Sequence, residues 1–177
     1  ACIKYNGLKL VKALKAAHPD KKILVDLKTM DAGEYEATPF FEAGGDITTV
    51  LGASDEATMK GVIKAANANN AEAQIDLIGV EDKSAVAKQA AANGAHIIGV
   101  HTGLDAQAAG QTPFEDLKTI AGLGLNVKVS VAGGINKDTI QSTVRAGADI
   151  VVVGAAIYGA PSPAESAKEL RALVDAA

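Results

Sequence analysis

Aromatic side chains are scarce in this 177-residue chain, which has three Phe, three Tyr and no Trp. A chain with so few aromatic rings lacks the usual stacking platform for unpaired bases. The formal net charge is −4 at pH 7, so the excess of Lys and Arg that marks a nucleic-acid-binding surface is missing as well. We therefore expect no nucleic-acid partner.

Cysteine is represented by Cys2 alone, which excludes a disulfide framework and a thiolate metal cluster. No apolar run approaches the length of about 20 residues that a membrane helix needs, and the first residues do not resemble a signal peptide. We expect a soluble, cytoplasmic protein with no membrane partner. Because 48% of the residues are hydrophobic, we expect residues 1–177 to form a single domain around one core.

Six short runs rich in β-branched residues alternate with stretches of helical spacing. Runs with little polar alternation are typical of strands that are buried on both faces. The runs are residues 23–27, 47–51, 74–78, 97–100, 127–131 and 150–153. Helices are predicted for residues 57–67, 83–92 and 163–174, the last with Ser162 as N-cap and Pro163 in the first turn. The alternation predicts right-handed βαβ units and a parallel sheet.

One phrase of sequence occurs three times, at residues 42–50, 93–100 and 145–153. Each copy joins a helix end, a glycine suited to a left-handed C-cap, and a buried strand. The copies lie about 50 residues apart, the length of two βα units, which favours a parallel β/α (TIM-type) barrel over an open doubly wound sheet. Such a barrel has eight strands. With six counted, we expect an N-terminally incomplete barrel that lacks its first strand, first helix and second strand.

Three charges cluster where the first predicted strand ends. Asp26 and Lys28 project to the same side of the strand because side chains alternate, and Asp31 follows. Opposite charges inside a barrel must be paired, hydrated, or bound to a ligand or metal. Since barrels carry their active sites at the carboxyl ends of the strands, this cluster indicates catalysis, with a structural salt bridge as the alternative.

Two other residues are candidates for the same site. Asp76 lies within an apolar strand and needs a partner, for which Lys28 is suited; a purely structural pair remains open. His101 follows the next strand and can transfer a proton near neutral pH, although a surface role remains open. His18 and His96 are interpreted as surface residues without function.

The last two predicted strands end in small residues, at positions 132–134 and 154–156. Small side chains let a ligand reach backbone N–H groups, and barrels commonly bind phosphate after strands seven and eight. Phosphate binding is therefore favoured over ordinary turns. The sequence contains no P-loop, no dinucleotide fingerprint and no metal-binding pair of histidines.

Together these motifs resemble the orotidine 5′-monophosphate decarboxylase superfamily, within it the branch of 3-hexulose-6-phosphate synthase and 3-keto-L-gulonate-6-phosphate decarboxylase. The Asp-x-Lys-x-x-Asp signature is Asp26, Lys28 and Asp31. Residues 50–52, 101–103, 107–110, 131–134 and 153–159 also match. The synthases are the more similar group. Their pattern is found at Leu104, Asp76 and Ala132, where the gulonate decarboxylases carry arginine, glutamate and threonine.

The resemblance implies an aldehyde-lyase of carbohydrate metabolism, the formaldehyde-fixing aldolase of the ribulose monophosphate pathway. Formaldehyde and D-ribulose 5-phosphate would give D-arabino-3-hexulose 6-phosphate through a metal-bound enediolate. Two alternatives remain, the sister decarboxylase and a non-catalytic fragment or scaffold of the same fold. In the relatives the first strand supplies a substrate-binding aspartate and the second a glutamate on the metal. Since both strands are expected to be missing, we expect residues 1–177 alone to be nearly inactive.

The resemblance also implies roles for individual residues. Asp26 would ligate Mg²⁺, Lys28 would stabilise the enediolate oxygens, and His101 would move the proton at the reacting carbon. Asp31 would reach the active site of a partner subunit, so a homodimer is expected. The expected catalytic set is Lys28, Asp31, Asp76 and His101. The expected phosphate-binding N–H groups are those of Gly134, Gly154 and Ala155.

Overall fold

The computed structural model describes residues 2–177, which fall into two compact units that divide between Ile98 and Gly99. The elements of the first unit are α1 (Cys2–Ala17), β1 (Leu24–Thr29), α2 (Gly33–Glu42), β2 (Ile47–Leu51), α3 (Glu56–Ala68), β3 (Glu72–Asp76) and α4 (Lys83–Ala92). The division falls within β4 (Ile97–His101). The elements of the second unit are α5 (Leu104–Ala108), α6 (Phe114–Gly122), β5 (Lys128–Ala132), α7 (Ile140–Arg145), β6 (Ile150–Val152), α8 (Ala155–Tyr158) and α9 (Pro163–Asp175).

All six predicted strands are present, in the sheet order β1-β2-β3-β4-β5-β6. β1 pairs with β2, β2 with β3, and β5 with β6, each time in parallel. The third strand begins and ends two residues earlier than predicted. Its apolar run continues through Leu77 and Ile78, but Asp76 Oδ1 accepts the N–H of Ile78 at 3.0 Å and turns the chain. Asp76 is therefore the last residue of its strand.

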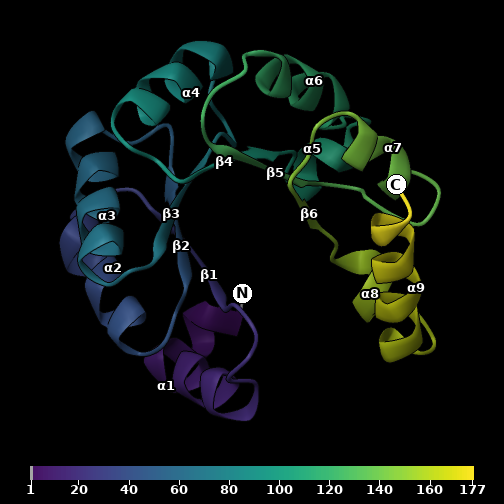
Figure 1. The fold of residues 1–177 in the computed structure, drawn as a ribbon, viewed down its shortest axis with the longest axis horizontal. Coiled ribbons are helices and arrows are strands. Elements are labelled where there is room, and N and C mark those ends of the chain that lie inside the picture. The colour runs from purple at the N-terminus through teal and green to yellow at the C-terminus, as the bar shows by residue number, and fades with distance from the viewer. Residues whose placement is uncertain (1) are drawn as a thin grey trace. The chain divides into compact units, whose positions relative to one another are not determined.

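The core of the first unit lies between its strands and its helices, which line one face of β1 to β3 (Figure 1). Val25, Val50 and Ile75 point to that face and are at most 3% exposed. Helix α3 contributes buried side chains with helical spacing, as its pattern predicts. The polar side chains of Asp26, Thr49 and Asp76 lie on the opposite face of these strands, because successive side chains alternate between faces.

In the second unit, the buried apolar side chains come mainly from α6, α7 and β5. Leu117 and Ile120 of α6 are buried, as are Val129 and Val131 of β5. Helix α9 contacts α7 and α8 and buries Leu170. Its amino end confirms the prediction for Ser162, whose hydroxyl accepts the N–H of Glu165. Among the described residues, no helix is both long and apolar enough to cross a bilayer.

The repeated phrase forms the same hydrogen bond in each of its three copies. The residue just before each strand accepts the backbone N–H of the residue at the start of the preceding strand. We call Asp46, His96 and Asp149 the latch residues. The bonds join Asp46 Oδ2 to Ile23 N at 2.7 Å, His96 Nδ1 to Ala73 N at 3.1 Å, and Asp149 Oδ2 to Val129 N at 2.8 Å. His96, which the sequence suggests to be a surface residue, is half-buried and has a structural role, since its imidazole takes the place of a carboxylate in this hydrogen bond.

Candidate active site

A lysine held by two carboxylates occupies the carboxyl ends of β1 and β3. Lys28 Nζ lies 2.6 Å from Asp76 Oδ2 and 3.0 Å from Asp26 Oδ1. The Asp76 side chain is 3% exposed, whereas Asp26 is 50% exposed. The ion pair that the sequence predicts between Lys28 and Asp76 is thus present, and the structure brings three of the predicted site residues together.

The charge of Lys28 is stabilised within this cluster. Partial burial acts to lower the pKa of Lys28, but the hydrogen bond and negative charge of Asp76, followed by those of Asp26, outweigh it. The pKa is therefore raised above its ordinary value of 10.5. Lys28 is a cation at neutral pH, suited to stabilising negative charge on a substrate and unsuited to acting as a general base.

The backbone of β1 is distorted at Lys28. The register shifts between the pairs Val25–Thr48 and Thr29–Val50, where four residue steps along β1 lie opposite two steps along β2. Lys28 takes a left-handed conformation with φ of 50°, which costs a non-glycine residue about 1–3 kcal/mol. Bulges of this kind redirect side chains and are common next to active sites.

Asp31 lies apart from this cluster, just before α2. Its Oδ1 accepts the N–H of Ala32 at 2.7 Å, and its side chain is exposed. Met30 and Tyr35 beside it are 55% and 84% exposed. One chain therefore does not bring Asp31 to Lys28, and its predicted role in a partner subunit's site stays a prediction.

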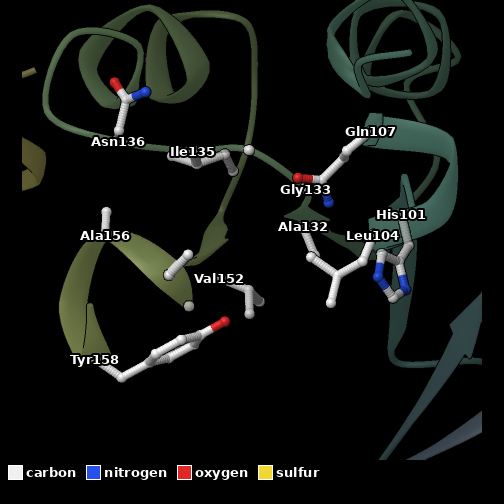
Figure 2. A pocket seen from close by; sticks show the side chains of 13 residues that line it. His101, Leu104, Gln107, Ala132, Gly133, Ile135, Asn136, Val152, Ala156 and Tyr158 are labelled. Atoms are coloured by element: carbon white, nitrogen blue, oxygen red, sulfur yellow. The ribbon is translucent and has the colours of Figure 1, made fainter. Parts of the chain in front are cut away.

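A separate cavity of about 490 Å³ opens within the second unit. His101, the last residue of β4, stands at its edge, and the Leu104 and Tyr158 side chains project into it (Figure 2). The predicted phosphate-binding residues line the same cavity, namely Gly134, Gly154 and Ala155. Four of the predicted site residues therefore share one cavity.

The turn after β5 requires glycine. Gly133 has φ of +125°, and a Cβ built there would lie 2.7 Å from the Thr102 carbonyl oxygen. Gly134, with φ of +66°, follows at the cavity wall. Because neither residue has a side chain, the backbone of this turn can be approached by a ligand.

The segment after His101 forms the short helix α5 at residues 104–108. Its Leu, Ala and Gln residues are strong helix formers. Gln107 Nε2 donates to the Thr102 carbonyl at 2.7 Å. This bond fixes α5 beside the cavity, and Leu104 is 72% exposed there.

The described residues offer limited ligands for a metal. They contain no group of three or more His, Cys, Asp or Glu side chains placed to hold an ion. At Asp26, both hydrogen bonds from Lys28 and Thr49 go to Oδ1, so Oδ2 remains available to a cation. One carboxylate fits Mg²⁺, which is commonly held by one or two carboxylates, several waters and the substrate.

The amino-acid sequence matches a known family. Residues 1–170 match the orotidine 5′-phosphate decarboxylase / HUMPS family. The chain belongs to this family of decarboxylases and synthases. Its relatives carry the names of enzymes, which confirms the expectation that this chain is an enzyme.

Individual relatives agree with the synthase branch. The 3-hexulose-6-phosphate synthase of Methylomonas aminofaciens is 62% identical over 172 residues, covering 97% of this chain and 82% of that protein. A crystal structure of a 3-hexulose-6-phosphate synthase is 48% identical with a TM-score of 0.91, covering 97% of this chain and 83% of the other. The structure of 3-keto-L-gulonate-6-phosphate decarboxylase from Vibrio cholerae is 29% identical with a TM-score of 0.84, covering 98% and 81%. These matches confirm the predicted family and the parallel β/α barrel fold class.

Proposed function

We propose that this protein is a 3-hexulose-6-phosphate synthase, which condenses formaldehyde with D-ribulose 5-phosphate to D-arabino-3-hexulose 6-phosphate. The observation that carries the proposal is Lys28, held as a cation between Asp26 and Asp76 at the carboxyl ends of its strands. The 62% identity to the Methylomonas aminofaciens synthase supports the same reaction. That residues 1–177 form a single domain remains a prediction.

Lys28 supplies the electrostatic part of the reaction. Removing a proton from the carbon next to the carbonyl group of ribulose 5-phosphate gives an enediolate, in which the former carbonyl oxygen carries the negative charge. The Lys28 ammonium is fixed before the substrate arrives, so little reorganisation is needed to stabilise that charge. Asp76 is almost fully buried and keeps the lysine both charged and oriented.

The second unit supplies the phosphate site and a proton-transfer group. The cavity beside Gly134, Gly154 and Ala155 accommodates a phosphate through backbone N–H groups. His101 stands at its edge (Figure 2) and moves the proton at the reacting carbon, as a general base. The Leu104 side chain gives this cavity an apolar wall.

A metal ion and a second subunit complete the proposal. Mg²⁺, bound through Asp26, would supply positive charge to the reacting oxygens of the substrate. The stretch from Asp31 to Tyr35, in which Tyr35 is 84% exposed, would form the interface of a homodimer, so that Asp31 reaches the partner's site. Light scattering that shows only monomer at working concentration would contradict the dimer.

The second candidate function is decarboxylation of 3-keto-L-gulonate 6-phosphate, which the 29% identity to the Vibrio cholerae enzyme keeps open. That reaction needs a polar group to hold its intermediate, and the family's decarboxylases carry arginine where this chain has Leu104. The apolar side chain that projects into the cavity therefore favours the synthase.

The deciding experiment offers the purified natural protein both substrates in parallel. We expect consumption of formaldehyde that requires ribulose 5-phosphate, stops with EDTA and returns with Mg²⁺. Release of CO₂ from 3-keto-L-gulonate 6-phosphate should be much slower. Faster CO₂ release than formaldehyde consumption would assign the decarboxylase instead, and activity that persists after complete chelation would remove Mg²⁺ from the proposal.

A further inference from the structure

Thr49 in β2 forms two hydrogen bonds to the lysine-bearing segment of β1. Its Oγ1 accepts the backbone N–H of Lys28 at 2.9 Å and lies 2.8 Å from Asp26 Oδ1. A hydroxyl group has a single hydrogen to donate. Because one bond is accepted from an N–H, that hydrogen is directed to the Asp26 carboxylate.

These bonds close a ring. Asp26 Oδ1 also accepts a hydrogen bond from Lys28 Nζ at 3.0 Å. The ring thus runs from the Lys28 backbone through the Thr49 hydroxyl and the Asp26 carboxylate to the end of the Lys28 side chain. It fixes the lysine at both ends.

The ring lies where β1 departs from regular pairing. The bulge moves the Lys28 N–H away from the backbone ladder, and a buried N–H without an acceptor is unfavourable. Thr49 is 1% exposed, so water cannot take its place as acceptor. The side chain of Thr49 therefore stabilises the left-handed conformation that directs Lys28 towards Asp76.

The neighbouring threonine provides a contrast. Thr48 is equally buried, at 0% exposed, but among the described residues its Oγ1 has no hydrogen-bond partner. Successive side chains of a strand point to opposite faces, so Thr48 faces the helices while Thr49 faces Asp26. The two neighbouring threonines thus differ, because only the hydroxyl of Thr49, and not that of Thr48, forms hydrogen bonds with other described residues.

We propose that Thr49 is a positioning residue, whose hydroxyl holds the Lys28 backbone and the Asp26 carboxylate in the geometry that catalysis requires. This inference rests on the proposed synthase reaction for its kinetic consequence. Its structural content, the ring of hydrogen bonds, is independent of which reaction the protein catalyses.

The test compares Thr49→Val, which keeps the shape and removes the hydroxyl, with Thr49→Ser, which keeps the hydroxyl, and with Thr48→Val as the matched control. In the formaldehyde condensation, kcat should fall about 10–100-fold in Thr49→Val, in line with losses of supporting hydrogen bonds and orientation. KM for ribulose 5-phosphate should change much less. Thr49→Ser should recover most of kcat, and Thr48→Val should match the unaltered protein.

A second measurement separates this inference from the proposed function. Amide hydrogen exchange of Lys28, followed by NMR, should be at least about tenfold faster in Thr49→Val and unchanged in Thr48→Val and Thr49→Ser, since only the first lacks the acceptor. An inactive unaltered protein would end the synthase proposal, and the exchange data would then decide the role of Thr49. Equal exchange and equal kcat in Thr49→Val and Thr48→Val would overturn the inference, leaving Thr49 as a core residue only.

Discussion

The two ends of the parallel strands use similar charged residues in different ways. At the amino end, Asp46 accepts the N–H of Ile23 and pairs with Lys15 at 2.9 Å, so its charge serves the backbone. At the carboxyl end, Lys28 forms ion pairs with the side chains of Asp26 and Asp76. The latch residues at the amino end each accept a backbone N–H from the neighbouring strand. At the carboxyl end Lys28 is bonded by the two carboxylates, and Asp76 accepts an N–H from its own segment, that of Ile78.

The difference shows how a charged residue's partner indicates its role. A carboxylate that satisfies a buried N–H removes a cost that the fold would otherwise carry. A buried ion pair is, by contrast, weak support for stability, because desolvation offsets much of the attraction. The carboxyl-end cluster also includes the strained backbone of Lys28. Strained backbone of this kind is concentrated at functional sites, which supports the proposed catalytic role of Lys28.

The largest effect is expected from a comparison of two lysines, each of which forms an ion pair with a carboxylate. Lys28→Ala should lower the turnover of ribulose 5-phosphate by about 10²–10³, the usual loss when one positioned donor is removed. Lys22, which pairs with Glu72 at the amino end at 2.7 Å, is the matched control, and Lys22→Ala should leave turnover within about twofold, as exposed pairs contribute little. Steady-state kinetics of the two variants checks this. An equal loss of turnover in the two variants would contradict the functional difference between the two ends of the strands.

A smaller effect is expected in the turn beside the cavity. Gly133→Ala should destabilise the protein by about 1–3 kcal/mol, because φ of +125° and the Thr102 carbonyl at 2.7 Å both oppose a Cβ. It should also weaken binding of inorganic phosphate. Gly122→Ala is the control, since a Cβ there meets no atom within 4 Å. Urea unfolding and phosphate titration measure both effects, and similar stability in the two variants would contradict the steric argument.

At the amino end, replacing the latch residue Asp149 should lower stability and leave kcat unchanged. Asp149→Ala removes the acceptor for the Val129 N–H and should lower the free energy of unfolding by about 1 kcal/mol, the usual net value of such a bond. Asp149→Asn, which keeps an acceptor oxygen, should lose less. The kcat of both variants should stay near that of the unaltered protein. A large fall in kcat without a change in unfolding would contradict the division of labour between the ends.

The smallest effect tests whether the latch positions are interchangeable. His96→Asp should leave the free energy of unfolding within about 0.5 kcal/mol of the original, because a carboxylate can accept the Ala73 N–H as it does in the other two copies. His96→Ala should cost about 1 kcal/mol, since that N–H loses its acceptor. Urea unfolding near pH 7.5 measures both. If His96→Asp proved as costly as His96→Ala, the three copies would not be equivalent.

Much of the fold and of the charged cluster follows from local pattern. The alternation of β-branched runs with helical spacing predicts the six strands. Parallel strands present their carboxyl ends at one edge, so Asp26, Lys28 and Asp76 could be expected to meet. Ser162 followed by proline likewise predicts the start of the last helix, because capping depends on neighbouring residues only.

The remaining features depend on the pairing between strands, which cannot be read from local patterns in a single sequence. The bulge at Lys28 has no glycine to mark it, and its φ of 50° is held by Thr49 from the next strand. Threonine is common in strands, so nothing distinguishes Thr49 from Thr48 until the register is known. The structural role of His96 could be predicted from the sequence, because His96 occupies the Asp position of the repeated phrase.

The latch bonds have a consequence for the order in which the chain folds. Each joins residues 20 to 23 positions apart, so each closes a short loop within one βαβ unit. The bond between Lys28 and Asp76 spans 48 positions and depends on two such units being in register. Because contacts close in sequence form sooner, we expect strand pairing to be established unit by unit during synthesis. Lys28 then pairs with the buried Asp76 only after the latch bonds have joined the amino ends of the strands.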